Sequence, residues 1–544
     1  MEKLGQKDML KISGGANFSS IVYAANGIQA RRDPFTWFMS GSLNFSVLDW
    51  SIPFNYSYSN QHGTFTQPFN QVSLTPQYKW FKGYAGYNSM TFSSYTMAGY
   101  VFLGGGIELN PGNWRISAMY GQLNKPVPYD AITDSDANMA YKRMGYGAKA
   151  GYEKNGHSLH LILFKASDDP LSIPFIPLNT AVLPKDNTVI SMIGKTKLNA
   201  HFSLEGEYAL SGLTRNILSA EDVTAERKNY FPGLFIMRST SQFFSAYKTA
   251  FAYHAQQFNV RLQYERVAPD YQTLGAYYFN NDLENITIAP SISLLKGKLN
   301  LSLNSGFQRN NLDKTKLNDT RRFVNAANMN MMVSNKLSLN ASYSNFSSYT
   351  KNRPQNDPFF YNTLDTLNFY QVTQSANAGV SYNFGNARLK QGLTLFTSYQ
   401  VTGQRTGTRE QVPAVVYNGN LGYNLGWLPT KTSGSITFNI NQSVMDALIA
   451  TYWGPNLSIA QTLMNNELRI NAGGTLNQVV GNGKTNSNVF NSRIGVNYVP
   501  KVKDPKYGKP TFGITCNYLK RMRSQQNAKK FSELTAMINL SYSF

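Results

Sequence analysis

Apolar and polar side chains alternate along most of this chain. The pattern is clearest at residues 534–544, where mostly polar side chains separate the apolar residues Leu534, Ala536, Ile538, Leu540, Tyr542 and Phe544. Successive side chains of a β-strand point to opposite faces of a sheet, so this segment predicts a strand with one apolar and one polar face. Residues 299–304, 337–344 and 436–441 repeat the pattern, and no helical stripe longer than a turn or two competes with it.

Turn residues divide the alternating segments at regular intervals. Short turns are predicted at residues 48–50, 81–83, 111–113, 154–156, 198–199, 256–257, 296–298, 334–336, 385–387, 429–431 and 465–467. One longer and more polar loop lies between each pair of these turns. Loops that alternate between short and long are typical of an up-and-down barrel with one trimmed and one elaborated rim. We therefore predict an all-β fold, an antiparallel up-and-down β-barrel of about 26 strands, with roughly 22 to 26 compatible with the pattern.

A soluble β-sandwich or propeller would also alternate apolar and polar residues. It is not expected to keep the short–long order of loops from the first hairpin to Phe544, so the barrel is favoured. The barrel is predicted to occupy residues 9–544 as a single domain, after an N-terminal periplasmic extension at residues 1–8. Residues 1–7 contain no apolar signal core, so we expect the chain to be the mature form without its signal peptide.

Composition favours a membrane barrel over a soluble one. Aromatic residues make up 13% of the chain and charged residues only 15%. No run of about 18 apolar residues predicts a membrane-spanning helix. A transmembrane barrel needs one face toward lipid, one toward water, and aromatic girdles at both interfaces. We therefore expect a multi-pass β-barrel of the bacterial outer membrane, with short turns facing the periplasm and long loops facing outside.

The net charge is +21, and many of the lysines occur in or beside the short turns. These lysines are Lys82, Lys154, Lys195, Lys197, Lys296, Lys298, Lys336, Lys431, Lys501, Lys503, Lys506 and Lys509. Basic charge at one rim is expected to contact the phosphates of outer-membrane lipid and lipopolysaccharide. The alternative is a field that draws anionic solutes or an acidic partner to that mouth. Nucleic-acid binding is not expected, because the basic residues are spread over many turns.

A second group of charges is predicted to point into the lumen. Residues Glu205, Glu207, Lys248, Arg261 and Glu265 lie opposite the apolar faces of three neighbouring strands. The alternation therefore brings charges of both signs to one stretch of inner wall. Two interpretations remain open: a network of ion pairs within the wall, and a patch for ion selectivity or plug docking.

Catalytic and metal-binding patterns are weak. The chain has five histidines, and His157 and His160 are spaced so that a strand sends them to opposite faces. The lone Cys516 can form no intramolecular disulfide and gives no metal-ligand spacing. Gly194-Lys195-Thr196 ends like a phosphate loop but lacks the first glycine of that motif and a following helix. We expect no enzymatic activity, no catalytic residues, no cofactor and no metal.

The chain resembles the large outer-membrane barrels of Bacteroidota. The resemblance rests on residues 26–54, Ala118-Met119-Tyr120-Gly121, residues 269–285 and the terminal Phe544. It implies that Leu540, Tyr542 and Phe544 match the signal that the barrel-assembly machinery reads. TonB-dependent transporters of this lineage begin with a globular plug domain, whereas the strand pattern here starts by about residue 9. We therefore expect a barrel without such a plug.

A barrel of this width needs something to fill it. Barrels of 16–18 strands already enclose a water channel, and the diameter grows with strand number. One hypothesis is a channel or transporter for solutes whose lumen is constricted by inward-folded loops. The alternative is a non-enzymatic subunit of an outer-membrane export, assembly or surface-display complex, occluded by a lipoprotein or another plug partner.

Overall fold

The computed structural model describes most of the chain. The described residues are 10–60, 70–129, 139–177, 182–222, 229–278, 280–315, 321–345, 348–351, 369–402, 405–406, 409–410, 414–446, 448–482, 484–502, 504, 508–524 and 530–544. The predicted N-terminal extension at residues 1–8 lies outside the described residues.

Antiparallel strands account for nearly all of the regular structure. Their bounds are β1 Leu10–Asn26, β2 Phe35–Val47, β3 Trp50–Ser59, β4 Gln71–Leu74, β5 Gln77–Tyr78, β6 Phe81–Thr91, β7 Ala98–Leu109, β8 Trp114–Asn124, β9 Lys142–Lys154, β10 His157–Asp169, β11 Asp186–Lys197, β12 Phe202–Thr214, β13 Ser241–His254, β14 Phe258–Val267, β15 Leu283–Leu294, β16 Leu299–Arg309, β17 Arg321–Met332, β18 Leu337–Ser344, β19 Ser348–Lys351, β20 Phe369–Gly385, β21 Leu389–Thr402, β22 Arg405–Thr406, β23 Arg409–Glu410, β24 Ala414–Trp427, β25 Thr432–Met445, β26 Leu448–Leu463, β27 Leu468–Gly481, β28 Lys484–Tyr498, β29 Lys509–Ser524 and β30 Phe531–Ser543. Two single-turn 3₁₀ helices, η2 Leu295–Gly297 and η3 Met464–Asn466, lie in turns.

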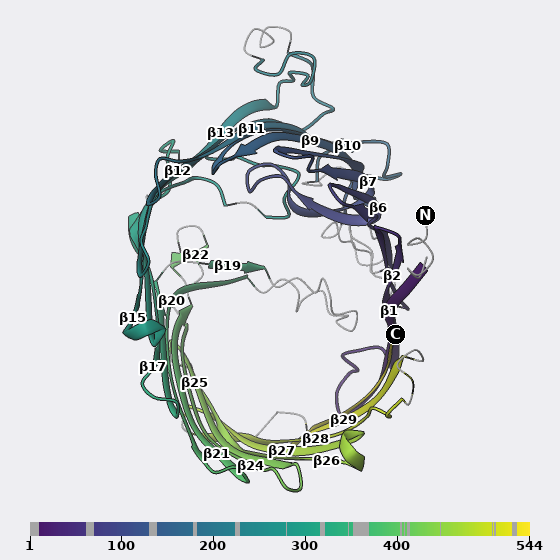
Figure 1. The fold of residues 1–544 in the computed structure, drawn as a ribbon, viewed down its shortest axis with the longest axis vertical. Helices are drawn as coiled ribbons and strands as arrows, with labels where there is room; N and C mark the ends of the chain where they lie inside the picture. The colour runs from purple at the N-terminus through teal and green to yellow at the C-terminus, as the bar shows by residue number, and fades with distance from the viewer. Residues whose placement is uncertain are drawn as a thin grey trace, which may run out of the picture.

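The sheet closes on itself. Within the described residues it contains 28 strand segments. Segments β4 and β5 both lie between β3 and β6, and β19 continues β18 along β20, so the segments form 26 strands. Each strand pairs with its neighbours in the chain, and β1 pairs antiparallel with β30 from Gly15 opposite Ser543 to Asn26 opposite Ser532. Figure 1 shows the resulting ring, with both termini at one seam. The predicted up-and-down barrel is confirmed.

The two faces of the sheet differ as the alternation predicts. On β12, Leu204 and Tyr208 point outward and are 42% and 49% exposed, whereas the inward-pointing Glu207 is only 5% exposed. Large apolar residues that remain exposed on the outer face include Leu161, Met192, Leu262, Ile286, Leu421, Ile436, Leu457, Ile494 and Ile514. A closed sheet pairs its backbone groups internally, which a lipid environment requires. With this apolar exterior the sheet is a transmembrane barrel. None of the helices in the described part of the chain is long and apolar enough to span a membrane.

The order of short and long connections holds over most of the barrel and fails near its end. Only residues 446–447 separate β25 from β26, and only residues 482–483 separate β27 from β28, on the rim where long loops are predicted. Asp446 and Asn482 take positive φ angles of 53° and 46°, which Asp and Asn tolerate in tight hairpins. The connection at residues 499–508, on the opposite rim, is correspondingly long. The prediction of a strict short–long order was therefore wrong for the last strands.

One predicted turn is also displaced. Residues 81–83 were expected to form a turn, but they open β6, and the turn lies at residues 79–80. Lys79 takes a φ angle of 48° there. The ring of Trp50 stacks on that of Tyr78 at 5.0 Å and meets that of Phe81 edge-on at 5.9 Å, so aromatic packing on both sides fixes this turn.

Candidate functional site

The inner wall of the first half of the barrel carries a packed core. Two loops, residues 92–97 between β6 and β7 and residues 268–278 after β14, fold onto the inner faces of neighbouring strands. We call these two segments the loop shelf. Its buried members pack with inward-facing side chains of the wall in one cluster, which contains Met90, Phe92, Tyr95, Met97, Tyr100, Phe102, Met119, Leu123, Ile162, Phe164, Val189, Val267, Tyr271 and Leu274.

The two segments of the loop shelf bind each other. The Tyr271 hydroxyl donates to the backbone oxygen of Tyr95 at 2.7 Å, and the Thr273 hydroxyl donates to that of Thr96 at 2.5 Å. Met97 forms a parallel bridge with Gly275. The rings of Tyr95 and Tyr271 meet edge-on with centroids 6.3 Å apart. Because Tyr271 has no exposed surface, its hydrogen bond is shielded from water. Loss of that bond would leave a buried polar group without a partner and would lower the free energy of unfolding.

Asn187 on β11 fastens the shelf to the wall. Its side-chain oxygen accepts from the backbone N–H of Leu274 at 3.0 Å. Its amide group donates to the Ser211 hydroxyl at 2.8 Å, and that hydroxyl donates to the backbone oxygen of Gln272 at 2.7 Å. Asn187 and Ser211 are fully buried. A buried amide with both of its ends satisfied fixes the position of residues 272–274 against the sheet.

The five charged residues predicted to share the inner wall lie on β12, β13 and β14. Lys248 stands opposite Glu207 on one side and Glu265 on the other. Its Nζ lies 3.2 Å from a Glu207 oxygen, and Ser191 donates to Glu207 at 3.2 Å. Glu205 pairs with Arg261 nearby, but both of their side chains are about one third exposed, at 34% and 38%. The pair of Glu207 and Lys248, which we call the deep pair, is therefore less accessible to water than the shallow pair of Glu205 and Arg261.

The charged residues also hold the loop shelf. The Tyr95 hydroxyl donates to Glu265 at 2.5 Å. The Lys248 ammonium donates to the Ser94 hydroxyl at 3.1 Å and lies 5.1 Å from the centre of the Tyr95 ring. These five charged residues, which we call the charge patch, thus form ion pairs within the wall and also contact a loop of the same chain. The ion pairs within the wall correspond to one of the two interpretations left open by the sequence, and a role of the patch in ion selectivity or plug docking stays a prediction.

The two shelf tyrosines remain hydrogen-bond donors over the whole physiological range. Burial raises the pKa of Tyr95, and the neighbouring carboxylate of Glu265 raises it further. Burial likewise raises the pKa of Tyr271 well above its usual value, with a smaller contribution from Glu207. A phenol kept neutral beside a carboxylate donates its proton in a strong hydrogen bond.

Sequence reasoning missed several residues of this site. Residues 92–97 were not separated from the adjoining strands, and Asn187 reads as an ordinary polar position of a strand. Lys149 on β9 also reaches the shelf, where its Nζ donates to the backbone oxygen of Phe92 at 3.1 Å. One signal was available: the loop after β14 carries three tyrosines, Tyr271, Tyr277 and Tyr278, where an exposed loop would be more polar.

The residues of the predicted assembly signal lie at the seam. Leu540, Tyr542 and Phe544 point outward and are about equally exposed, at 40%, 41% and 41%. The backbone of Phe544 exchanges two hydrogen bonds of 2.9 Å with Gly14 of β1. The last residue of the chain therefore takes part in closing the barrel.

No family model matches the chain, and no curated protein matches it. Among solved structures it is similar to the ferric enterobactin receptor PfeA of Pseudomonas aeruginosa, with 11% identity, a TM-score of 0.41, and coverage of 98% of this chain and 80% of that one. It is also similar to the FrpB iron transporter of Neisseria meningitidis, at 12% identity, a TM-score of 0.38, and 98% and 82% coverage. The translocation pore of the P pilus usher PapC gives 11% identity, a TM-score of 0.37, and 97% and 98% coverage. Likenesses this distant carry no argument about what the chain does.

Proposed function

We propose that this protein is a bacterial outer-membrane channel or transporter for solutes whose lumen is constricted by the loop shelf. The observation that carries the proposal is the shelf itself, held to the inner wall by Asn187, Lys248 and Glu265. A barrel of this strand number is wide enough for an aqueous channel. Loops fixed inside it by buried hydrogen bonds narrow the channel without closing the whole cross-section, since they pack on β6–β14.

The orientation and assembly of the barrel follow from the same proposal. The rim with the lysine-rich short turns faces the periplasm, where ammonium groups contact lipid phosphates, and the rim with the long loops faces outside. The outward side chains of Leu540, Tyr542 and Phe544 are accessible to the barrel-assembly machinery while the last strand is still unpaired. Closure then follows when β30 pairs with β1.

A second function is favoured by apolar side chains on the long loops. Leu171 is 91% exposed and Tyr230 is 67% exposed, and Phe175 and Ile236 lie near them in the chain and are also exposed. Apolar side chains displayed at a membrane rim suit contact with another protein. The alternative is therefore a non-enzymatic subunit of an export, assembly or surface-display complex, in which a lipoprotein or other plug partner caps the barrel.

Planar-bilayer recordings of the purified chain test the channel proposal. We expect steady, ion-selective conductance, smaller than that of an unobstructed barrel of the same strand number, because the shelf occupies part of the lumen. Silence, or a very large unselective conductance, would contradict the proposal. Affinity purification from native membranes separates the two functions: a stoichiometric partner at the long-loop rim supports the complex, and its repeated absence counts against it.

A further inference from the structure

The inner wall across the barrel from the loop shelf contains a groove. It is formed by the inward faces of β24–β28 and the adjoining ends of β20 and β21, and holds about 840 Å³. Strands β24, β26, β27 and β28 are labelled along the bottom of the ring in Figure 1, away from β6–β13 at the top. We call it the amide groove, after the side chains that line it: Asn383, Asn424, Ser433, Ser435, Asn456, Ser458, Asn471 and Asn491, together with Lys390, Arg469 and Arg493.

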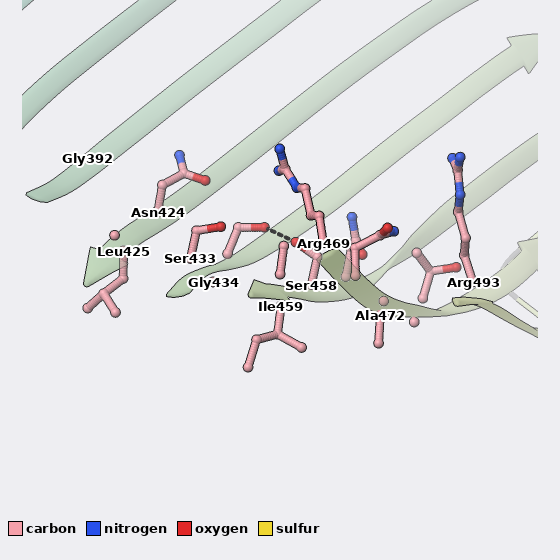
Figure 2. A pocket seen from close by; sticks show the side chains of 18 of the residues that line it. Gly392, Asn424, Leu425, Ser433, Gly434, Ser458, Ile459, Arg469, Ala472 and Arg493 are labelled. Carbon is pink, nitrogen blue, oxygen red and sulfur yellow. Dashed lines mark hydrogen bonds between the residues drawn. The ribbon is translucent and has the colours of Figure 1, made fainter. Parts of the chain in front are cut away.

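The strand register arranges the lining in lateral rows. One row runs through Gly392, Asn424, Ser435, Ser458, Gly473 and Arg493 on six successive strands. The Ser435 and Ser458 hydroxyls share a hydrogen bond of 2.6 Å. In Figure 2, Asn424, Arg469 and Arg493 extend to one side of the sheet while Leu425 and Ile459 extend to the other. Gly392 and Gly473 add no side chain to the row, so the groove is deeper at these two positions.

Three cations in the groove have no acidic partner in the part of the chain that the structure describes. Among the described residues, no lining side chain is acidic, and none of the ion pairs involves Lys390, Arg469 or Arg493. All three side chains are exposed to the lumen. Unpaired cations in a concave wall concentrate positive potential and draw anions to it. Two of the three are arginines, whose guanidinium group matches a carboxylate, sulfate or phosphate with two parallel hydrogen bonds.

The remaining lining offers donors and acceptors without charge. Each asparagine amide presents an acceptor oxygen and two N–H donors, and each serine hydroxyl can do both. This is the chemistry that pairs with the hydroxyl groups of a sugar. Six strands separated by about 4.8 Å place Lys390 and Arg493 roughly 24 Å apart across the sheet, so the cations are spaced for a chain of several units instead of one small anion.

We infer that the amide groove binds a polyhydroxylated chain that bears anionic groups, that is, a short acidic oligosaccharide. The inference rests on the proposed channel function and names the class of solute that its lumen takes. Arginine and lysine bind the anionic groups, and the amides and hydroxyls bind the sugar hydroxyls between them. The loop shelf on the opposite wall leaves this face of the lumen open to the solute.

Binding to the detergent-solubilised barrel tests the inference directly. The probes are an oligogalacturonate hexamer, which is acidic, and maltohexaose, which is neutral and of equal length. We expect calorimetry to show at least about tenfold tighter binding of the acidic probe, and the triple variant K390Q/R469Q/R493Q to remove that preference. The matched control is the double variant K298Q/K336Q, which removes two exposed lysines from short turns outside the groove and should leave binding unchanged.

Three results would overturn the inference: equal affinity for the two probes, an unchanged preference in the triple variant, or an equal loss in the control. Heat-modifiable electrophoretic mobility shows whether each variant folds, and R493K retains charge and should keep most of the affinity. Since calorimetry needs no open pore, the two proposals fail separately. If the protein binds the acidic probe but shows no conductance in bilayers, the channel proposal is contradicted and the proposed binding in the groove is supported. If it conducts but does not bind the acidic probe, the channel proposal is supported and the proposed binding is contradicted.

Discussion

The two halves of the inner wall use polar residues in opposite ways. On β11–β14, Asn187 and Glu207 are buried: Asn187 binds Leu274 of the loop shelf, and Glu207 pairs with Lys248 of the wall, which itself donates to Ser94 of the shelf. In the amide groove of β24–β28, the asparagine and serine side chains remain half-buried or exposed, and Arg469 and Arg493 have no acidic partner among the described residues. The first wall is therefore built to hold a part of its own chain, and the second is left available to a solute.

The outer faces of the same strands show no such difference. Leu204 and Tyr208 on β12 and Leu457 and Ile459 on β26 are all large, apolar and exposed. Lipid imposes one requirement all around the barrel, so the outside is uniform. The lumen imposes no common requirement, and its chemistry varies from sector to sector. Functional differences within a barrel are therefore to be sought on the inward-facing positions.

The largest expected effect is the loss of the shelf. Tyr271→Ala removes a fully buried ring and its hydrogen bond to Tyr95, and we expect a decrease of about 3–5 kcal/mol in the free energy of unfolding. The released shelf should also raise the single-channel conductance. Urea unfolding in lipid vesicles and planar-bilayer recording measure the two effects on the same preparation.

Tyr278→Ala is the matched control for that variant. Tyr278 belongs to the same loop but is 46% exposed, so its truncation should change the free energy of unfolding by less than about 0.5 kcal/mol. If both variants conduct like the unaltered protein, the shelf does not constrict the lumen, whatever it contributes to stability.

A smaller effect separates the deep and shallow ion pairs of the charge patch. The Glu207 side chain is 3% exposed, whereas Glu205 and Arg261 are about one third exposed. Double-mutant cycles with E207Q and K248M should give a coupling energy of about 1.5–3 kcal/mol, because an unpaired buried charge is costly. The cycle with E205Q and R261M should give less than about 1 kcal/mol. Equal coupling energies would show that burial does not distinguish the two pairs.

The sequence predicts what is periodic and local. Alternation along β30 gives the strand and both of its faces, and the same rule places Glu207, Lys248 and Glu265 on the inner wall. It does not predict the contact between Tyr95 and Glu265, because they are 170 residues apart and only the inward fold of residues 92–97 onto the wall brings them together. The short connection between β27 and β28, residues 482–483 of the sequence, shows where the expected order of loops fails locally. Its Asn-Gly dipeptide is typical of a two-residue hairpin, a signal stronger than the expected order of loops.

For the amide groove, too, the sequence predicts the local feature and not the contacts between distant strands. Polar alternation shows that Arg469 and Arg493 face the lumen, but which residues lie beside them depends on the register across several strands. That register is fixed by pairings between whole strands, such as Arg493 opposite Gly473. A single-residue shift would send every side chain of a strand to the other face. The amide groove is therefore a property of the assembled sheet, and no segment of the sequence contains it.

The smallest expected effect compares two asparagines, one from each wall. Asn439 on β25 is half-buried and accepts a hydrogen bond from Asn420, and lumenal water can replace that partner. We expect Asn439→Ala to lower the free energy of unfolding by less than about 1 kcal/mol, whereas Asn187→Ala, which leaves buried groups of the shelf without partners, should cost about 1–3 kcal/mol. Urea unfolding of both variants measures the difference. A loss at Asn439 as large as that at Asn187 would mean that the asparagines of β24–β28 hold the wall together, and the contrast between a wall that binds its own chain and one left open to a solute would no longer stand.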